Sequence, residues 1–305
     1  MKKLVLTFAL LLLATTAFSL PPLLQKQSFK VRDIENLDFD LNWEELEIQQ
    51  SNETDNISIE IYCNKEKYAP KIKSSDSSIS VKNTVKNIIS IGTNVKCTVI
   101  ARIPSTANFE KININTTSGN ISADNIYSEK LYSSSTSGSI TINGFSGEKC
   151  SLDTTSGKIK LINVSTEDTR LNSTSGSITL EGIVSSDFEV SSTSGTIGIE
   201  LYAIPKSNSR VTTTSGTIFI GLPDNSSFSL HVNTTSGSFT NAFTKETISN
   251  HVSYRADINK GGTKIILSAT SGRITVDSTN GVITNTYNGS AESDIPVVSF
   301  EDPIF

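Results

Sequence analysis

The chain has 305 residues, of which 26 are Lys or Arg and 31 are Asp or Glu, so its formal net charge is −5 at pH 7. A mildly acidic chain without long runs of like charge is not expected to bind nucleic acid or an anionic membrane surface. Its two His and three Cys show no metal-ligand spacing, so we expect neither a metal site nor another cofactor.

Residues 1–19 have the features of a secretory signal peptide. Lys2 and Lys3 precede an apolar run that ends at Leu13, and the small residues Ala17 and Ser19 precede the expected cleavage point. The apolar run is too short to span a membrane. We therefore expect an exported product without a transmembrane span, located in the periplasm, at the cell surface or outside the cell.

Between residues 20 and 104, apolar and polar residues alternate in several short runs. The clearest are Leu37 to Trp43, Ile57 to Cys63 and Val95 to Ile103. Such alternation is typical of strands with one buried face. We interpret 20–104 as an N-terminal β cap with irregular first rungs, because an open stack of strands needs its end covered.

The three cysteines have different predicted roles. Cys63 and Cys97 fall on the apolar side of their strands, so in an exported chain they can face each other and form a disulfide. The sequence leaves open whether they are bonded. Cys150 falls on the apolar parity of the repeat that follows, and we expect a buried, unreactive thiol.

From residue 105 to 276 the chain repeats the tripeptide Thr-Ser-Gly. Successive glycines are 19 residues apart over the first five copies, and then 21, 21 and 35 residues apart. A fixed period near 20 is the mark of a stacked repeat. The eight glycines are Gly119, Gly138, Gly157, Gly176, Gly195, Gly216, Gly237 and Gly272.

Apolar residues alternate on both sides of each tripeptide, at seven and five residues before the glycine and two and four after it. No single copy can bury these side chains, whereas copies stacked about 4.8 Å apart form one core. The predicted fold is an all-β, single-stranded parallel β-solenoid with about eight Thr-Ser-Gly rungs of 19–21 residues. A fifth inward column is predicted seven residues after the glycine, through Ile126, Phe145, Val164, Ile183 and Tyr202.

The eight glycines are predicted to turn the chain at the same place on every rung, with a positive φ that Gly adopts without a steric penalty. The Thr and Ser before each glycine are interpreted as hydroxyl ladders that support the turn. A row of serine nucleophiles would need a base beside each copy, and none recurs.

The last step between glycines contains extra residues, and we expect those around 241–260 to form a loop or hairpin that leaves the stack. Insertions of this kind often carry binding function in solenoids. Residues 277–305 are expected to form a C-terminal cap or tail.

Exported β-helices are often polysaccharide lyases or hydrolases, which need paired carboxylates, or a base with calcium, on neighbouring rungs. The outward positions six and four residues before each glycine, and one and three after it, contain no acidic cluster. From these positions we expect that no face carries one. Arg170, Glu189 and Arg210 lie on adjacent rungs, and we interpret them as a row of solvated charges.

The segments Ile103-Pro104, Ile112 to Ile121, Gly261-Gly262 and Thr270 to Ile274, together with the repeated Ser-Gly-x-Ile, resemble a bacterial family of unknown function. This is domain-of-unknown-function family forty ninety-seven, which is labelled adhesin. The resemblance covers roughly residues 28–276 and implies a right-handed β-helix. It transfers no catalytic residues.

We therefore predict an exported, non-enzymatic β-solenoid that acts at the cell envelope as an adhesive, structural or binding module. Its partner would be a surface ligand such as a glycan or an envelope protein. The alternative is a carbohydrate-active β-helix of the lyase or hydrolase kind, with its site at Arg170, Glu189 and Arg210 or within 241–260.

Overall fold

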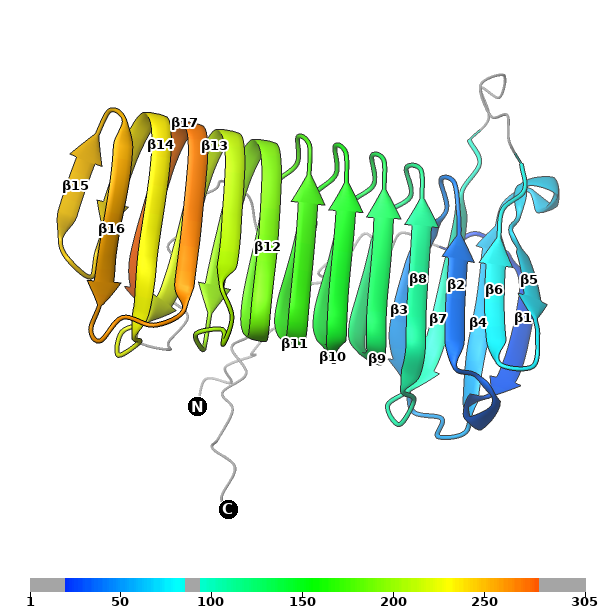
Figure 1. Cartoon of the computed structure of the whole chain (residues 1–305). Coiled ribbons are helices and arrows are strands. Elements are labelled where there is room, and N and C mark those ends of the chain that lie inside the picture. Colours follow the sequence, from blue (N-terminus) through cyan, green and yellow to red (C-terminus); the bar gives the residue numbers. More distant parts are fainter. Residues whose placement is uncertain (1–19, 86–93, 280–305) are drawn as a thin grey trace, which may run out of the picture.

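The computed structural model describes residues 20–85 and 94–279; the predicted signal peptide and residues 280–305 lie outside this range. The described chain is all-β, and hydrogen bonds join its strands in one long, mostly parallel sheet (Figure 1). No helix within the described ranges is long and apolar enough to cross a membrane. The strands are β1 (Leu23–Lys30), β2 (Asn36–Asp40), β3 (Glu45–Ser51), β4 (Asn56–Cys63), β5 (Lys71–Ser74), β6 (Ser78–Lys82), β7 (Cys97–Pro104), β8 (Phe109–Thr116), β9 (Ile121–Ser135), β10 (Ile140–Thr154), β11 (Ile159–Ser173), β12 (Ile178–Leu201), β13 (Ser209–Pro223), β14 (Phe228–Asn241), β15 (Glu246–Ser249), β16 (Val252–Ile258) and β17 (Lys264–Thr279), and the short 3-10 helices are η1 (Val31–Asp33) and η2 (Glu66–Tyr68).

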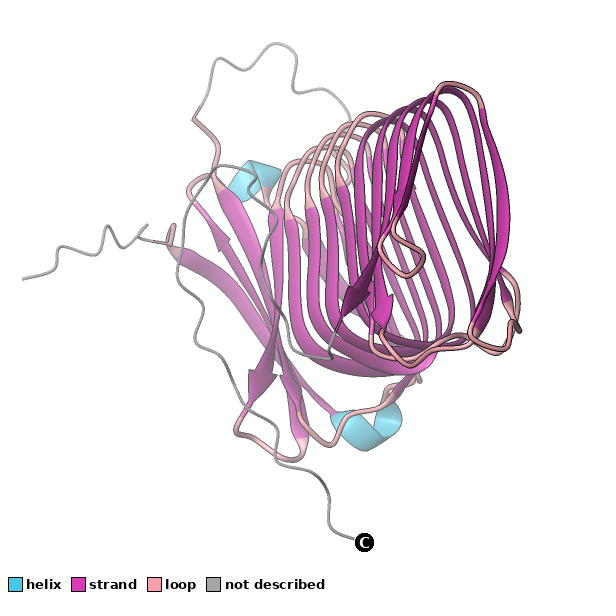
Figure 2. Cartoon of the chain, turned by 90° about the vertical axis from the view of Figure 1, so that its left-hand side faces the viewer, coloured by secondary structure: helices cyan, strands magenta, loops and turns pink. Residues whose placement is uncertain are grey.

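The sheet coils into a tube, which Figure 2 shows along the direction of stacking. Each of the strands β9, β10 and β11 runs from one Thr-Ser-Gly turn to the next and pairs in parallel with its neighbours. The copies are in register, because Ile140 lies opposite Ile121 on one side and Ile159 on the other. The predicted stacking of like residues is thus confirmed for these rungs.

The interior of the tube is the hydrophobic core. Every residue in the four predicted inward columns, from Ile112 to Val276, is at most 2% exposed. The polar members of these columns, such as Thr169 and Ser209, are as buried as the apolar ones. Strand parity is therefore correct in these four columns, and with it their assignment as inward positions.

The fifth column is only partly as predicted. Ile126, Phe145 and Val164 are buried, but Ile183 is 41% exposed. The register between β11 and β12 shifts after Leu161, so that Val164 lies opposite Gly182, and Val184 is buried instead of Ile183. A shift of one residue exchanges the inward and outward sides of a strand.

A second turn, opposite the Thr-Ser-Gly turn, forms a corner six residues after the glycine. Asn125, Gly144, Asn163 and Gly182 occupy this corner on successive rungs, and all have positive φ, from 49° to 145°. Asn and Gly are the residues that adopt this conformation most readily. The alternation of Asn and Gly at intervals of 19 residues is therefore the sequence signal of the corner.

The conformation predicted for the turn glycines is wrong for most of them. Only Gly195, Gly237 and Gly272 have φ in the left-handed region, at 155°, 157° and 146°. The reason for glycine is instead the distance between rungs: a Cβ on Gly138 would overlap the carbonyl oxygen of Gly119. The same overlap recurs at each of the eight turn glycines, against the glycine of the adjacent rung or, for Gly119, against Glu44.

Buried hydroxyl groups stabilise the first four turns. The residue three positions before each glycine, for example Ser135, accepts a hydrogen bond from the glycine amide, at 2.8–3.1 Å over the four copies. These hydroxyls satisfy a backbone donor that the tight turn would otherwise leave unpaired. The Thr and Ser of the tripeptide itself are exposed on every copy.

The N-terminal cap begins with a rung that lacks the tripeptide. Strands β2 and β3 continue the two sides of the tube by pairing with β8 and β9, and Glu44 stands where the glycine would be. The side chain of Glu44 is fully buried and accepts hydrogen bonds from the amides of Asn42 (2.8 Å) and Trp43 (3.2 Å). This carboxylate replaces the turn hydroxyl of the later rungs.

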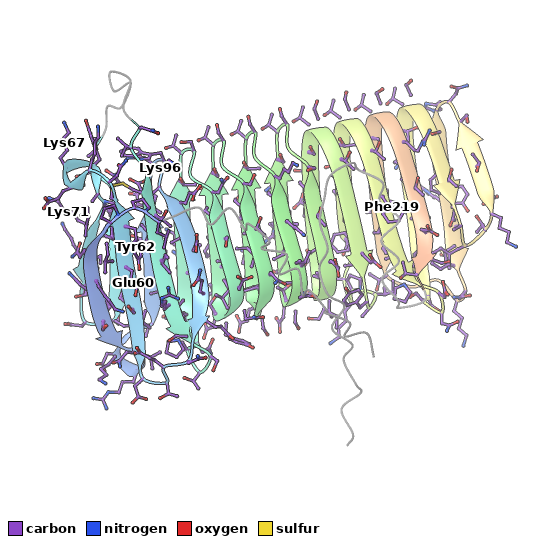
Figure 3. The ribbon with its side chains drawn as sticks, turned by 180° about the vertical axis from the view of Figure 1, so that it is seen from behind. Glu60, Tyr62, Lys67, Lys71, Lys96 and Phe219 are labelled. Carbon is purple, nitrogen blue, oxygen red and sulfur yellow. A yellow bond between two sulfur atoms is a disulfide. The ribbon has the colours of Figure 1, made fainter. Side chains whose placement is uncertain are left out.

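Antiparallel strands complete the cap. Strand β4 pairs with β1 and β7, and Cys63 and Cys97, opposite each other in this register, form a disulfide. On the same sheet, Glu60 accepts a hydrogen bond from Tyr62 Oη at 2.9 Å (Figure 3). Glu60 also forms an ion pair with Lys26, with Nζ and Oε1 2.9 Å apart. The ion pair ties the edge strand β1 to β4.

The order of strands at the C-terminal end departs from sequence order. Strand β17, with Gly272, lies between β13 and β14, so the last copy of the repeat separates the two copies that precede it (Figure 1). Ser268 lies opposite Thr212 of β13 on one side and Asn233 of β14 on the other. The expectation that successive copies are always neighbours is therefore wrong here.

Residues 241–260 do not leave the stack as expected. They contain β15 and β16, which pair antiparallel with β14 and cover the last rung. Phe239 and Tyr254 pack with ring centroids 4.8 Å apart, and Phe228 packs edge-on against Phe243. The segment is thus the C-terminal cap of the core.

The contact between turns predicts the effect of a methyl group. Replacement of Gly176 by Ala would place a Cβ on the carbonyl of Gly157, and we expect this overpacking to lower the free energy of unfolding by about 1–3 kcal/mol. Gly198 in β12 is the matched control, because a Cβ there has no atom within 4 Å. Thermal or urea unfolding checks both; equal melting temperatures for the two variants would contradict the role of the contact.

The strand order predicts which cysteine pairs can bond. Thr212→Cys with Ser268→Cys should form a disulfide, because these residues are neighbours on parallel strands, whereas Thr212→Cys with Asn233→Cys should not. The buried Cys150 is common to both variants. Mass spectrometry of the oxidised proteins distinguishes them, and a bond between positions 212 and 233 would support stacking in sequence order.

Candidate functional site

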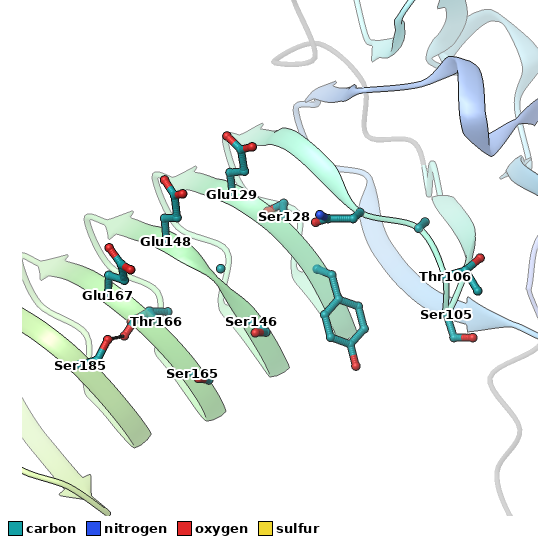
Figure 4. Close-up of a pocket in the computed structure, with 14 residues that line it drawn as sticks. Ser105, Thr106, Ser128, Glu129, Ser146, Glu148, Ser165, Thr166, Glu167 and Ser185 are labelled. Carbon is teal, nitrogen blue, oxygen red and sulfur yellow. Dashed lines mark hydrogen bonds between the residues drawn. The ribbon is translucent and has the colours of Figure 1, made fainter.

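A shallow groove crosses several rungs just after the corner of the tube (Figure 4). Its volume is about 640 Å³, and the loop between β7 and β8 closes one end. The side chains that line it are mostly Ser, Thr and Glu: Ser105, Thr106, Asn108, Tyr127, Ser128, Glu129, Ser146, Glu148, Ser165, Thr166, Glu167 and Ser185. The stacking of the repeat places equivalent residues side by side in this groove.

Three glutamates form a row along the groove. Glu129, Glu148 and Glu167 come from successive rungs, point in the same direction and are exposed (Figure 4). Neighbouring parallel strands are about 4.8 Å apart, so the row presents a negative charge at each such step. Within the described residues, none of the three has a Lys or Arg nitrogen within 4.0 Å. We call this row the glutamate row.

The conclusion that no face carries an acidic cluster is therefore wrong. The glutamates stand ten residues after the tripeptide glycine, a column that is not among the outward positions on which that conclusion depended. Alternation breaks there, because Glu129 and Lys130 both reach the surface between buried Ser128 and Leu131. A recurrence of Glu at intervals of 19 residues was the available signal.

An exposed column with apolar ends borders the glutamate row. Tyr127, Ser146, Ser165 and Ile183 lie opposite one another in consecutive strands. Tyr127 is 43% exposed and Ile183 is 41% exposed, and they are two of the five exposed large hydrophobic residues in the described chain. An aromatic ring at one end and hydroxyls beside it are features of carbohydrate-binding surfaces.

Ser128 lies between Tyr127 and Glu129 and also lines the groove. The residue is 1% exposed, and its hydroxyl has no hydrogen-bond partner within the described part of the chain. A buried hydroxyl without a partner is unfavourable by about 1–3 kcal/mol relative to a satisfied one. A water molecule or a ligand group in the groove can supply the missing bond.

The acidic side chains of the groove do not converge on one point. Among residues 20–85 and 94–279, no three His, Cys, Asp or Glu side chains are close enough together to hold a metal ion. The glutamate row is linear, since each member comes from a different rung. Its geometry suits an extended ligand with several positive groups more than a single ion.

Arg170, Glu189 and Arg210 are brought together, as their spacing predicted. They lie opposite one another on β11, β12 and β13, and Arg170 Nε is 3.9 Å from Glu189 Oε2. The two side chains of this pair are 40% and 54% exposed. At such exposure an ion pair contributes little to stability, which fits a row of solvated charges.

A pair of aspartates lies next to this row. Asp168 and Asp187 are opposite each other on β11 and β12. A hydrogen bond with Asp168, burial, and the negative charge of Asp168 raise the pKa of Asp187 above its usual value of 3.8, while Arg170 acts in the opposite direction. The pair therefore retains a shared proton to a higher pH than two isolated carboxyl groups would.

The remaining predicted residues have structural surroundings. Cys150 is fully buried, and burial raises the pKa of its thiol, so it is not a nucleophile. His251 to Ser253 of the 241–260 segment help to line a second groove of about 550 Å³. That groove is rich in Thr, Ser and Asn, and it contains no carboxylate among its lining residues.

Comparison with known proteins identifies relatives of the fold. The family model described as Toastrack DUF4097 matches residues 34–277. No protein of curated function matches the chain.

Three solved structures illustrate the similarity. A "putative adhesin" from Parabacteroides merdae ATCC 43184 is 15% identical, with a TM-score of 0.42 and coverage of 85% of this chain and 96% of that chain. A "putative adhesin" from Parabacteroides distasonis ATCC 8503 is 13% identical, with a TM-score of 0.44 and coverage of 85% and 98%. A "putative lipid binding protein" from the same strain is 12% identical, with a TM-score of 0.44 and coverage of 84% and 96%.

The aspartate pair predicts a pH dependence of stability. Because folding raises the pKa of Asp187, its favourable contribution is complete below the usual value of 3.8 and is lost as the pH rises through the raised value. Asp187→Asn should therefore melt at a higher temperature than the wild type at pH 7, and this difference should shrink on acidification. Asp76→Asn, an exposed carboxylate in the N-terminal cap, is the control and should show no such trend. A lower melting temperature for Asp187→Asn at pH 7 would contradict the shared proton.

Proposed function

Because the chain belongs to the Toastrack DUF4097 family, we propose that it is an exported, non-enzymatic β-solenoid that acts at the cell envelope as an adhesive, structural or binding module. We take the coil to be right-handed with eight Thr-Ser-Gly rungs, since parallel strands joined by a crossover are almost always right-handed. The product would act in the periplasm, at the cell surface or outside the cell.

One observation carries the binding role. In the groove the same exposed side chains recur on neighbouring rungs, so that Glu129, Glu148 and Glu167 offer the same group three times in a line. A catalytic site needs different groups that converge on one reacting bond. A row of identical groups suits instead a repetitive or extended ligand, such as a polymer.

Two features support export. Residues 1–19 have the sequence of a signal peptide, although they lie outside the described residues. The disulfide between Cys63 and Cys97 belongs to an oxidising compartment, because cytosolic thiols are normally kept reduced.

The alternative function is that of a carbohydrate-active enzyme, and the pair Asp168 and Asp187, beside Arg170 and Glu189, is the observation that favours it. In glycosidases the two catalytic carboxyl groups stand about 5 Å or more apart, with the scissile bond between them. Asp168 and Asp187 are instead close enough to share a hydrogen bond, which leaves no room for that bond between them. We therefore prefer the non-enzymatic role.

The test combines location with turnover. Cell fractionation should recover the protein from the periplasmic, envelope or extracellular fractions, and the purified mature chain should bind washed envelopes or members of a polysaccharide panel in a saturable manner. It should release no reducing ends or unsaturated sugars from that panel. Recovery in the cytosol alone would contradict export.

Variants at the charged row separate the two functions. Arg170→Ala, Glu189→Ala and Arg210→Ala should each change the free energy of unfolding by about 0.5 kcal/mol or less and leave binding intact. Sustained turnover by the wild type that disappears in Glu189→Ala, with an unchanged circular dichroism spectrum, would favour the enzyme instead.

A further inference from the structure

The glutamate row is a line of negative charge without an ion-pair partner within the described residues. Like charges close together on neighbouring strands are unfavourable, and Glu129, Glu148 and Glu167 occupy equivalent exposed positions on three successive strands (Figure 4). Lys111, Lys130 and Lys149 form a column in register one residue further along the strands, but no ion pair joins them to the row within the described residues. The ammonium group of Lys149 lies over the ring of Tyr132, 6.0 Å from its centroid, and Lys111 lies over the same ring at 5.4 Å. The row is thus free to attract a cationic ligand.

The shape of the row restricts the kind of cation. Its carboxylates do not meet as a metal-binding group, so a single metal ion would contact too few of them. A ligand with positive groups spaced along its length can contact the whole row. Such a ligand would lie across the rungs, parallel to the direction in which the strands stack.

The rest of the groove indicates sugar rings. Tyr127 exposes an aromatic ring at one end, and aromatic rings pack against the apolar faces of sugars. Ser146 and Ser165 continue its column as exposed hydroxyls, and the buried hydroxyl of Ser128, which has no hydrogen-bond partner within the described residues, lies beneath the groove surface. The exposed hydroxyls match those of a saccharide, whereas a simple polyamine would leave them unused.

From these contacts we propose that the groove binds an amine-bearing polysaccharide, whose protonated amino groups pair with Glu129, Glu148 and Glu167 while one sugar ring packs on Tyr127. This rests on the proposed function, since it names the ligand of a non-enzymatic binding module. The second groove, which is lined by Thr, Ser and Asn without a carboxylate, would not share this preference.

The test measures binding of the purified mature chain to a chitosan oligomer, in which every sugar carries a free amine, and to the chitin oligomer of equal length, in which the amines are acetylated. Chitosan should bind more tightly by about tenfold or more, because charge-assisted hydrogen bonds are lost on acetylation. The affinity for chitosan should fall steeply as the salt concentration rises, because salt screens the attraction between exposed charges. Equal affinity for the two oligomers would overturn the proposal.

Matched variants locate the site. The triple variant Glu129→Gln, Glu148→Gln and Glu167→Gln should lose most of the preference for chitosan. The control triple Glu45→Gln, Glu53→Gln and Glu66→Gln removes the same number of exposed charges from the N-terminal cap and should bind as the wild type does. All six positions are exposed, so both variants should keep the wild-type circular dichroism spectrum and melting behaviour. Equal loss in the two triples would show a general charge effect and no site in the groove.

Tyr127→Ala tests the sugar component. It should weaken chitosan binding several-fold and leave binding of polylysine unchanged. If the two probes weaken together, or if polylysine binds as tightly as chitosan, the groove recognises positive charge alone and the saccharide assignment fails.

Failure of this ligand proposal can be distinguished from failure of the proposed function. A wild-type protein that binds envelopes or another polysaccharide, but not chitosan, would overturn this ligand and leave the binding module standing. A protein that binds no envelope or polysaccharide would overturn both.

Discussion

The structure depends on one close contact, in which the turn glycine of each rung lies against the carbonyl of the turn on the adjacent rung. A Cβ at any of the eight positions would overlap that neighbouring backbone. Because the turns meet so closely, the inward columns on either side of them stay in register and bury their side chains almost completely. The glycine contact thus fixes the spacing of the rungs, and the apolar columns supply the free energy that holds them together.

This stacking also decides what kind of site the molecule can present. Any residue at an outward position of the repeat is placed beside its counterparts, so a single choice of side chain becomes a row. The glutamate row, the column from Tyr127 to Ile183, and Arg170 with Glu189 and Arg210 all arise in this way. Rows favour repeated weak contacts with an extended partner, in which several sites on one scaffold raise the overall affinity.

The sequence was most informative where period and parity determine the structure. The inward positions of Ile121, Ile140 and Ile159 follow from the alternation of apolar residues and from the 19-residue interval. The positions of Cys63 and Cys97 on the apolar sides of their strands are compatible with a disulfide but do not require one. The exposure of Ile183 could not be foreseen, because a local register shift opposite Val164 depends on how two strands fit each other. The position of β17 in the strand order could not be predicted either. Its apolar pattern is that of any other copy, so the sequence gives no reason for Ser268 to lie beside Thr212 as well as beside Asn233.

The inserted position of β17 has a consequence for how proteins of this architecture can change in length. Between Gly119 and Gly195 each rung touches only the copies before and after it, so duplication or loss of one 19-residue unit there would leave both ends unaltered. Duplication of the last unit would instead need a second place between β13 and β14, beneath a cap that is already closed by β15 and β16. Evolutionary variation in rung number should therefore be confined to the middle of the stack. A homologue lengthened by duplication of a unit that contains Glu129, Glu148 or Glu167 would gain a further member of the glutamate row and keep the same two caps.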